Sequence, residues 1–139
     1  MKKPYNPILG EFHRAFWHLQ DNHWGVYIAE QVSHHPPISV YFYHASDSGV
    51  IIEGEFAPKS KFLGNSIVSL MEGRTVLYSK NRTDERYFIT YPNAYARGIL
   101  FGKMFIELGD QARINCPETG YLAEIDFHVK VKTSSKGIF

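Results

Sequence analysis

The sequence has almost no cysteine, no marked excess of charge and no long apolar run. Its single cysteine, Cys116, cannot form an internal disulfide, which is typical of reducing compartments, and we expect this thiol to pack rather than react. With 15 basic and 14 acidic residues the net charge is +1, so no broad field would attract nucleic acid or an anionic membrane. No apolar stretch approaches the roughly 18 residues of a membrane span, and the N-terminus lacks the apolar core of a signal peptide. These absences make a cytoplasmic location the expectation.

What is present is a β-type pattern in a chain large enough for a core. The 139 residues are 44% hydrophobic and 15% aromatic, which argues against disorder, and no segment has the period of an amphipathic helix. Only the polar segment 132–137 is expected to fray. Alternation and turn residues predict an antiparallel meander of about ten strands: Phe12–Leu19, Gly25–Val32, Ile38–Ala45, Val50–Phe56, Asn65–Met71, Thr75–Lys80, Arg86–Tyr91, Gly98–Leu108, Ala112–Cys116 and Tyr121–Val131.

The predicted strands differ in how many of their faces are apolar. Val50–Phe56 and Tyr121–Val131 alternate, with one apolar and one mostly polar face. Ile38–Tyr43 and Gly98–Leu108 are apolar on both faces and need cover on each. Two architectures satisfy this pattern: the wall of a barrel around a cavity, and an ordinary sandwich core.

The most distinctive stretch is Glu30–Pro37, E-Q-V-S-H-H-P-P, in which two histidines precede two prolines. Successive side chains of a strand point to opposite faces, so His34 and His35 can address one ligand only if the strand ends there. Pro36 favours that ending, because proline restricts the preceding residue and lacks the N–H that a sheet needs. Imidazoles held protonated by an anion donate through both nitrogens, so the pair suits a phosphate.

Other interpretations of the histidine pair remain open at this point. The two rings could be solvated groups on a rigid corner that ends the strand. Zinc is weakly supported, since no other histidine or cysteine lies at a recurring ligand spacing. Catalysis would need His34 or His35 as a general base oriented by Glu30, yet no G-x-S-x-G elbow is present and Ser33 has no evident oxyanion hole.

The octapeptide resembles the fingerprint of the oxysterol-binding protein family, whose domains carry lipids between membranes. The segment Lys2–Glu11, K-K-P-Y-N-P-I-L-G-E, is similar to the family's K-P-x-N-P-x-L-G-E, and 98–100 and 119–121 also match related sequences. The resemblance implies a mainly β fold, in which an antiparallel meander forms part of a large lipid-enclosing β-barrel. It further implies that residues 1–139 are the central portion of one lipid-binding domain, without its lid and C-terminal part, and function only within a longer chain.

The resemblance also assigns site residues. In the family, the lysine and asparagine of the first segment and both histidines contact the headgroup of phosphatidylinositol 4-phosphate, which implies Lys3, Asn6, His34 and His35 here. The segment 58–66, P-K-S-K-F-L-G-N-S, looks like that of the phosphatidylserine-carrying branch, and it makes Ser60 the candidate for the serine headgroup. Lys3 as a solvated terminal residue, Asn6 as a turn residue and Ser60 on an exposed loop are the alternatives.

The expected function is therefore lipid exchange without covalent chemistry and without a cofactor. Phosphatidylinositol 4-phosphate would be exchanged for phosphatidylserine, or alternatively for a sterol, during transient contact with membrane surfaces. A phosphoinositide sensor that does not transport lipid would share the headgroup residues. Contact sites between the endoplasmic reticulum and the plasma membrane are the location that the phosphatidylserine branch implies.

Overall fold

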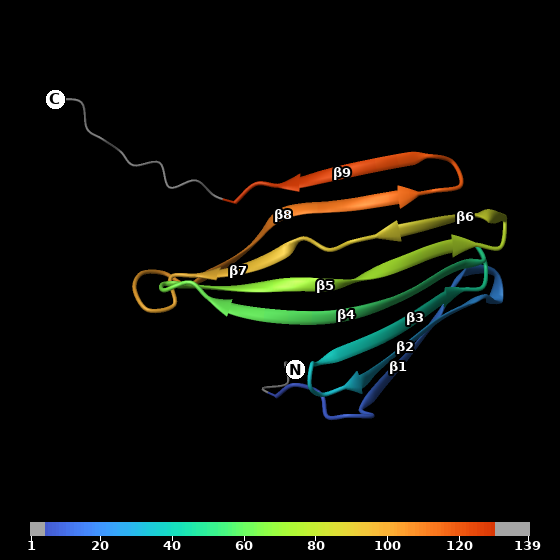
Figure 1. The fold of residues 1–139 in the computed structure, drawn as a ribbon. Coiled ribbons are helices and arrows are strands. Elements are labelled where there is room, and N and C mark those ends of the chain that lie inside the picture. Colours follow the sequence, from blue (N-terminus) through green and yellow to red (C-terminus); the bar gives the residue numbers. More distant parts are fainter. Residues whose placement is uncertain (1–4, 130–139) are drawn as a thin grey trace.

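The computed structural model describes residues 5–129, apart from the Thr83 side chain. These residues form one open, twisted sheet (Figure 1). Lys3, the end of the predicted last strand and the segment 132–137 lie outside the described residues. In the described part of the chain there are nine strands and one short 3-10 helix: β1 (Phe12–His18), η1 (Gln20–Asn22), β2 (Trp24–Ser33), β3 (Ile38–Ala45), β4 (Val50–Phe62), β5 (Ser66–Ser79), β6 (Arg82–Ile89), β7 (Asn93–Arg97), β8 (Phe105–Cys116) and β9 (Tyr121–Phe127).

Every pairing in the sheet is antiparallel; β1 to β5 each pair with the next strand in sequence, and so do β7 with β8 and β8 with β9. The strands β6 and β7 lie end to end between β5 and β8, in one shared position of the sheet that we call the lane. Thr75–Ser79 of β5 pairs with β6, and Ser66–Ser69 of β5 pairs with β7. The lane is interrupted only at residues 90–92. The antiparallel meander predicted from the sequence is confirmed.

Two predicted boundaries around β4 and β5 are wrong. β4 does not end at Phe56 but continues to Phe62. β5 is one strand where two were predicted, Asn65–Met71 and Thr75–Lys80, and it passes without interruption through Glu72–Gly73, where a turn was expected between them. Gly73 has φ +115°, and a Cβ on it would lie 2.2 Å from the carbonyl oxygen of Glu55. The glycine therefore marks a close approach of two paired strands, a role that a sequence cannot distinguish from a turn.

The predicted strand Gly98–Leu108 is also wrong. Its first part is a loop, 98–104, in which Gly98 and Gly102 have φ +69° and +99°. The short strand β7 before this loop was not predicted. Conversely, the sequence predicts a turn at Gly109–Asp110, between the strands Gly98–Leu108 and Ala112–Cys116, but this position lies inside β8, where Asp110 has φ +67° and the strand continues. Apolar residues dominate both sides of this region, so alternation could not locate the boundaries.

The register gives the sheet a face rich in aromatic residues, which we call the tyrosine face. Ala29, Tyr41, Gly54 and Thr75 lie opposite one another in successive strands. Because Gly54 has no side chain, the Tyr41 ring lies over it; a Cβ there would be 2.6 Å from the ring. Trp17 and Tyr43 likewise make an edge contact, with 6.2 Å between ring centroids, on either side of Gly25. Rings that lie along the sheet in this way cover its backbone with apolar surface.

A cluster of three hydroxyls stabilises the centre of this face. The hydroxyl of Tyr91 lies 2.9 Å from that of Tyr41 and 2.8 Å from that of Thr75, and Tyr41 and Thr75 are hydrogen-bonded to each other. The Tyr91 hydroxyl also donates to the carbonyl oxygen of Glu55 at 3.2 Å. Burial is the main reason why the pKa of Tyr91 is raised to about 12. The cluster joins β3, β4 and β5 to the break between β6 and β7.

We expect Tyr91→Phe to lower the free energy of unfolding by about 1 kcal/mol at neutral pH, because the cluster loses its shared partner. The raised pKa means that the hydroxyl stabilises the fold fully below pH 10 and ceases to do so as the pH rises to about 12. Urea denaturation of both proteins at pH 7 and at pH 11 should therefore show a smaller difference at the higher pH. Tyr121→Phe, at a site that is 77% exposed, is the control and should change nothing; equal stability of Tyr91→Phe and wild type at pH 7 would contradict the expectation.

Candidate functional site

The turn between β2 and β3 carries the histidine pair. β2 ends at Ser33 and β3 begins at Ile38, so the strand does end before the histidines, as predicted. Both imidazoles are exposed, and their ring centroids lie 4.4 Å apart. Within the described part of the chain neither ring has a hydrogen-bonding partner. Two neighbouring imidazoles placed in this way can donate to the same anion.

The side chain of Gln31 connects the two ends of this turn. It is 4% exposed; its Nε2 donates to the carbonyl oxygen of Ser33 at 2.7 Å, and its Oε1 accepts from the hydroxyl of Ser39. The register shifts between Gln31 and Ser33, which is the signature of a β-bulge. A buried amide with both ends satisfied fixes its neighbours well, so the turn is anchored on both strands.

The N-terminal segment is attached to the same glutamine. The Gly10 N–H donates to the carbonyl oxygen of Gln31 at 2.8 Å, and the Gln31 N–H donates to that of Glu11 at 3.0 Å. A tight turn precedes this pairing: the Glu11 N–H bonds to the carbonyl oxygen of Ile8, and Gly10 supplies the positive φ of +79°. The two segments singled out in the sequence therefore meet in space, and exposed Asn6 lies just before the turn.

Ser60 lies in β4, not on a loop. Ser39 pairs with Phe56, so β4 extends past the start of β3, and Ser60 lies about 13 Å further along the strand. Alternation from Gly54 puts Ser60 on the tyrosine face. Lys59 points to the other face and pairs with Glu72 at 2.6 Å, an exposed ion pair that contributes little to stability.

The predicted site residues that the structure describes lie toward one end of the sheet. Figure 1 shows the N-terminal segment and the β2–β3 turn in its lower middle and the far end of β4 at its left; β3 begins, and β4 ends, at this end of the sheet. A cavity of about 280 Å³ lies where the N-terminal segment crosses β1 to β3, between Pro7, Gln31 and Ser39. The arrangement places exposed hydrogen-bond donors beside an apolar face, as a ligand with a polar head and apolar tail requires.

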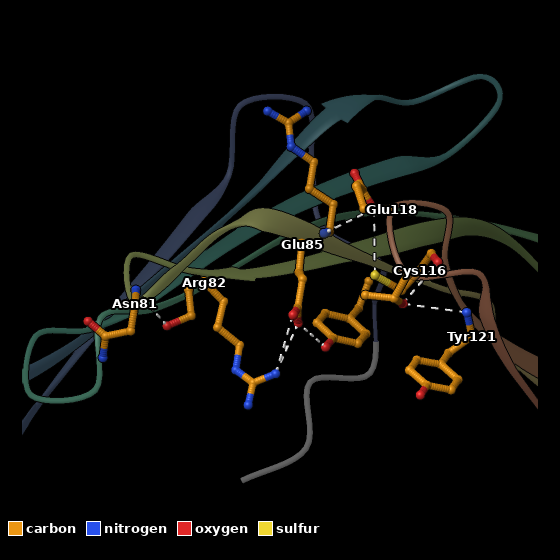
Figure 2. A network of polar contacts seen from close by, with 10 residues as sticks. Asn81, Arg82, Glu85, Cys116, Glu118 and Tyr121 are labelled. Carbon is orange, nitrogen blue, oxygen red and sulfur yellow. Dashed lines mark hydrogen bonds and ion pairs between the residues drawn. The ribbon is translucent and has the colours of Figure 1, made fainter.

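The other end of the sheet carries a polar network of a different kind, drawn in Figure 2. Glu85 accepts from Arg82 at 3.2 Å and from the hydroxyl of Tyr87, and these bonds lower the pKa of the carboxyl. Glu118 accepts from the backbone N–H of Arg86 at 3.4 Å, which ties β6 to the β8–β9 turn. The Cys116 thiol beside it is 1% exposed and packs in this region, as expected.

Two further features bear on possible chemistry. Among residues 5–129, no three histidine, cysteine, aspartate or glutamate side chains converge in a way that could hold a metal ion. The described residues also contain no helix long and apolar enough to cross a membrane.

Comparison with known proteins identifies the family. The family model for oxysterol-binding protein matches residues 1–138. The chain belongs to the oxysterol-binding protein family. It is 51% identical over 135 residues to oxysterol-binding protein homolog 7 of Saccharomyces cerevisiae, and 47% identical over 131 residues to human oxysterol-binding protein-related protein 8. Both matches cover 94% of this chain but only 30% and 15% of those relatives, respectively, so the chain spans less than a third of their length.

Solved structures of this family have the same fold. The crystal structure of the Osh3 ORD in complex with PI(4)P from Saccharomyces cerevisiae superposes with a TM-score of 0.80 at 26% identity, over 96% of this chain and 34% of that one. The Osh1 ORD in complex with ergosterol gives a TM-score of 0.70 at 31% identity, over 82% of this chain and 27% of that one. The predicted fold class, a meander that is part of a larger lipid-binding barrel, is confirmed by these neighbours.

Sequence reasoning did not single out Gln31, although it lies inside the octapeptide. A glutamine between an acidic residue and a valine is the pattern of an ordinary exposed polar residue in an alternating strand, so the sequence does not predict its burial. Its burial depends on the N-terminal segment that crosses over it, which is a contact between residues far apart in sequence. The only available signal was its position on the same face as Ala29 and Tyr27, which are small or aromatic.

Gln31→Met should lower the free energy of unfolding by about 1 kcal/mol or more, because the half-buried carbonyl of Ser33 and the half-buried hydroxyl of Ser39 lose their partner. We also expect faster hydrogen exchange in segment 32–38, where the anchor of the turn is lost. Ser39→Ala removes only one of the two bonds and should give a smaller effect. Unchanged exchange in the turn would contradict the role assigned to Gln31.

Proposed function

We propose that this protein binds lipids and transfers them between membranes, exchanging phosphatidylinositol 4-phosphate for a second lipid, with phosphatidylserine as the first candidate. The observation that carries the proposal is the histidine pair, which lies exposed beside the anchored N-terminal segment at the end of an apolar face. The likeness over 96% of the chain to the Osh3 ORD in complex with PI(4)P supports the first lipid.

In this proposal the headgroup is recognised by charge and hydrogen bonds. His34 and His35 donate to the phosphate, and an anion there favours their protonated forms. Asn6 serves inositol hydroxyls through its amide, and Lys3, which lies outside the described residues, adds a point charge. Gln31 acts through the turn, because it connects the N-terminal segment to the histidines.

The acyl chains would lie along the tyrosine face. Each buried methylene contributes roughly 0.8 kcal/mol, so the chains supply most of the affinity whichever headgroup is bound. The choice between lipids therefore falls to the polar end of the sheet. A phosphoinositide sensor needs only that end, so extraction of whole lipid from vesicles distinguishes it from a carrier.

Ser60 is the candidate that selects phosphatidylserine. It lies exposed on the tyrosine face, two positions from the end of β4, with a hydroxyl that can bond the serine ammonium or carboxylate. A sterol is the second candidate, supported by the likeness to the Osh1 ORD in complex with ergosterol. The membranes we propose are those of contact sites between the endoplasmic reticulum and the plasma membrane, which the protein would visit from the cytoplasm.

Replacing both histidines, His34→Ala with His35→Ala, should reduce transfer of phosphatidylinositol 4-phosphate between vesicles by about tenfold or more, since two charge-assisted bonds are lost. The assay uses labelled lipid and the longest natural chain that contains these residues. His18→Ala with His128→Ala, two exposed histidines away from the histidine turn and the cavity beside it, is the control. If the double substitution leaves transfer unaffected, the histidines are not headgroup ligands and only form the corner at which the strand ends.

Ser60→Ala should slow transfer of phosphatidylserine severalfold while leaving that of phosphatidylinositol 4-phosphate within about twofold, since one neutral hydrogen bond is at stake. Ser48→Ala, in the β3–β4 turn at the other end of the sheet, is the control. Equal effects on both lipids would reject Ser60 as the selecting residue. Transfer of sterol by the wild type, without transfer of phosphatidylserine, would favour the second candidate.

A further inference from the structure

Next to the far end of β4, two connections lie side by side and expose several large apolar side chains. One is the β4–β5 turn with the end of β4, residues 62–65, and the other is the β7–β8 loop, residues 98–104; we call them together the tip. We infer that the tip is the element that inserts into the surface of an anionic bilayer when the protein loads or releases lipid. This inference rests on the proposed lipid transfer and adds to it the part of the chain that contacts the membrane.

The tip is apolar where a globular surface is normally polar. Its large apolar side chains are more than half exposed: Phe62 63%, Leu63 54%, Leu100 60%, Phe101 78% and Met104 67%. These five side chains lie on two connections that are hydrogen-bonded to each other, and exposed apolar side chains gathered in this way mark protein or membrane contacts. A turn and a loop need side chains that favour their geometry, which leucine and phenylalanine do not provide.

The backbone of the tip is prepared for an apolar environment. The side chain of Asn65 accepts from the N–H groups of Leu100 and Phe101, at 2.8 and 3.0 Å, and donates to the Phe101 carbonyl oxygen at 2.9 Å. The Gly98 N–H donates to the Asn65 carbonyl oxygen at 3.0 Å. Backbone polar groups that enter a bilayer must be satisfied within the protein, and here the Asn65 side chain satisfies three of those in the loop. The side chains of Leu100 and Phe101 in the same segment are exposed.

Charge and position indicate a membrane as the occupant. Lys61 and Lys103 flank the apolar residues and are exposed, which suits the negative surface of a bilayer that contains anionic lipid. The tip lies at the same end of the sheet as the histidine turn (Figure 1). Docking by the tip would therefore bring the proposed headgroup residues and Ser60 toward the lipid that is to be exchanged.

The opposite end of the sheet provides a natural comparison. The start of β9 also exposes apolar side chains, Tyr121 at 77% and Leu122 at 58%. The charged residue of the turn before it is Glu118, however, and Glu124 in β9 is paired with Arg113 at 3.0 Å. Among the described residues this end offers no lysine beside its apolar residues, so equal exposure predicts binding to an anionic bilayer at the tip only.

The test measures binding to vesicles of equal parts phosphatidylcholine and phosphatidylserine by flotation, using the longest natural chain that contains these residues. Leu100→Ser with Phe101→Ser should weaken binding by about tenfold or more, since two exposed apolar side chains no longer enter the bilayer. Tyr121→Ser with Leu122→Ser is the matched control and should bind as the wild type does. Equal losses in both variants, or no loss in the tip variant, would overturn the inference.

Insertion is measured directly with Phe101→Trp. Lipids brominated in the acyl chains should quench the introduced indole, beyond any quenching of the wild-type tryptophans Trp17 and Trp24. If another part of a longer chain covers the tip instead, the indole will not be quenched and the serine variant will lose thermal stability, and either result would overturn the inference. Binding of a soluble short-chain phosphatidylinositol 4-phosphate separates this inference from the proposed function: the tip variant should keep it, and the His34→Ala, His35→Ala variant should lose it.

Discussion

The buried amide of Gln31 is the constraint on which the candidate site depends. Its side chain spans the two ends of the histidine turn, and its backbone pairs with Gly10 and Glu11. A single residue thus sets the distance between the N-terminal segment and the histidine turn, which are separated in the chain by β1 and β2. Because the amide is buried, leaving one of its hydrogen bonds unmade would be costly. The end of β2, the start of β3 and the N-terminal segment are therefore held in fixed positions relative to one another.

The two ends of the sheet are built from different chemistry. At one end are imidazoles, an asparagine and apolar connections, mostly exposed and little involved in ion pairs. At the other, Glu85 and Glu118 bind nearby donors and tie β6 to the turn that follows β8. One end is thus left open to a ligand and a surface, while the other consolidates the sheet. The hydroxyl cluster around Tyr91 lies between them and holds the centre.

The sequence was sufficient to predict the meander, the strand end before His34 and the family. These depend on local signals: alternation, a proline pair and an eight-residue motif. It was not sufficient where one residue type serves two purposes. Gly73 lies within a paired strand and Gly98 begins a loop, although both have positive φ. The role of Gln31 and that of Asn65 depend on partners distant in sequence, Gly10 and Phe101, and no local pattern reports them.

The shared lane of β6 and β7 has a consequence for how this sheet can vary. Residues 90–92 lie outside both strands, although the Thr90 N–H still donates to the carbonyl oxygen of Arg113 in β8, and Pro92 has no N–H to contribute. The register of β7, and with it the placement of the 98–104 loop, is therefore set by its own pairing with β5 and β8 rather than by a continuation of β6. A residue gained or lost at this break would move Tyr91 relative to Tyr41 and Thr75. The sheet thus contains a joint whose length is constrained by one side chain, because that side chain must still reach the hydroxyl cluster.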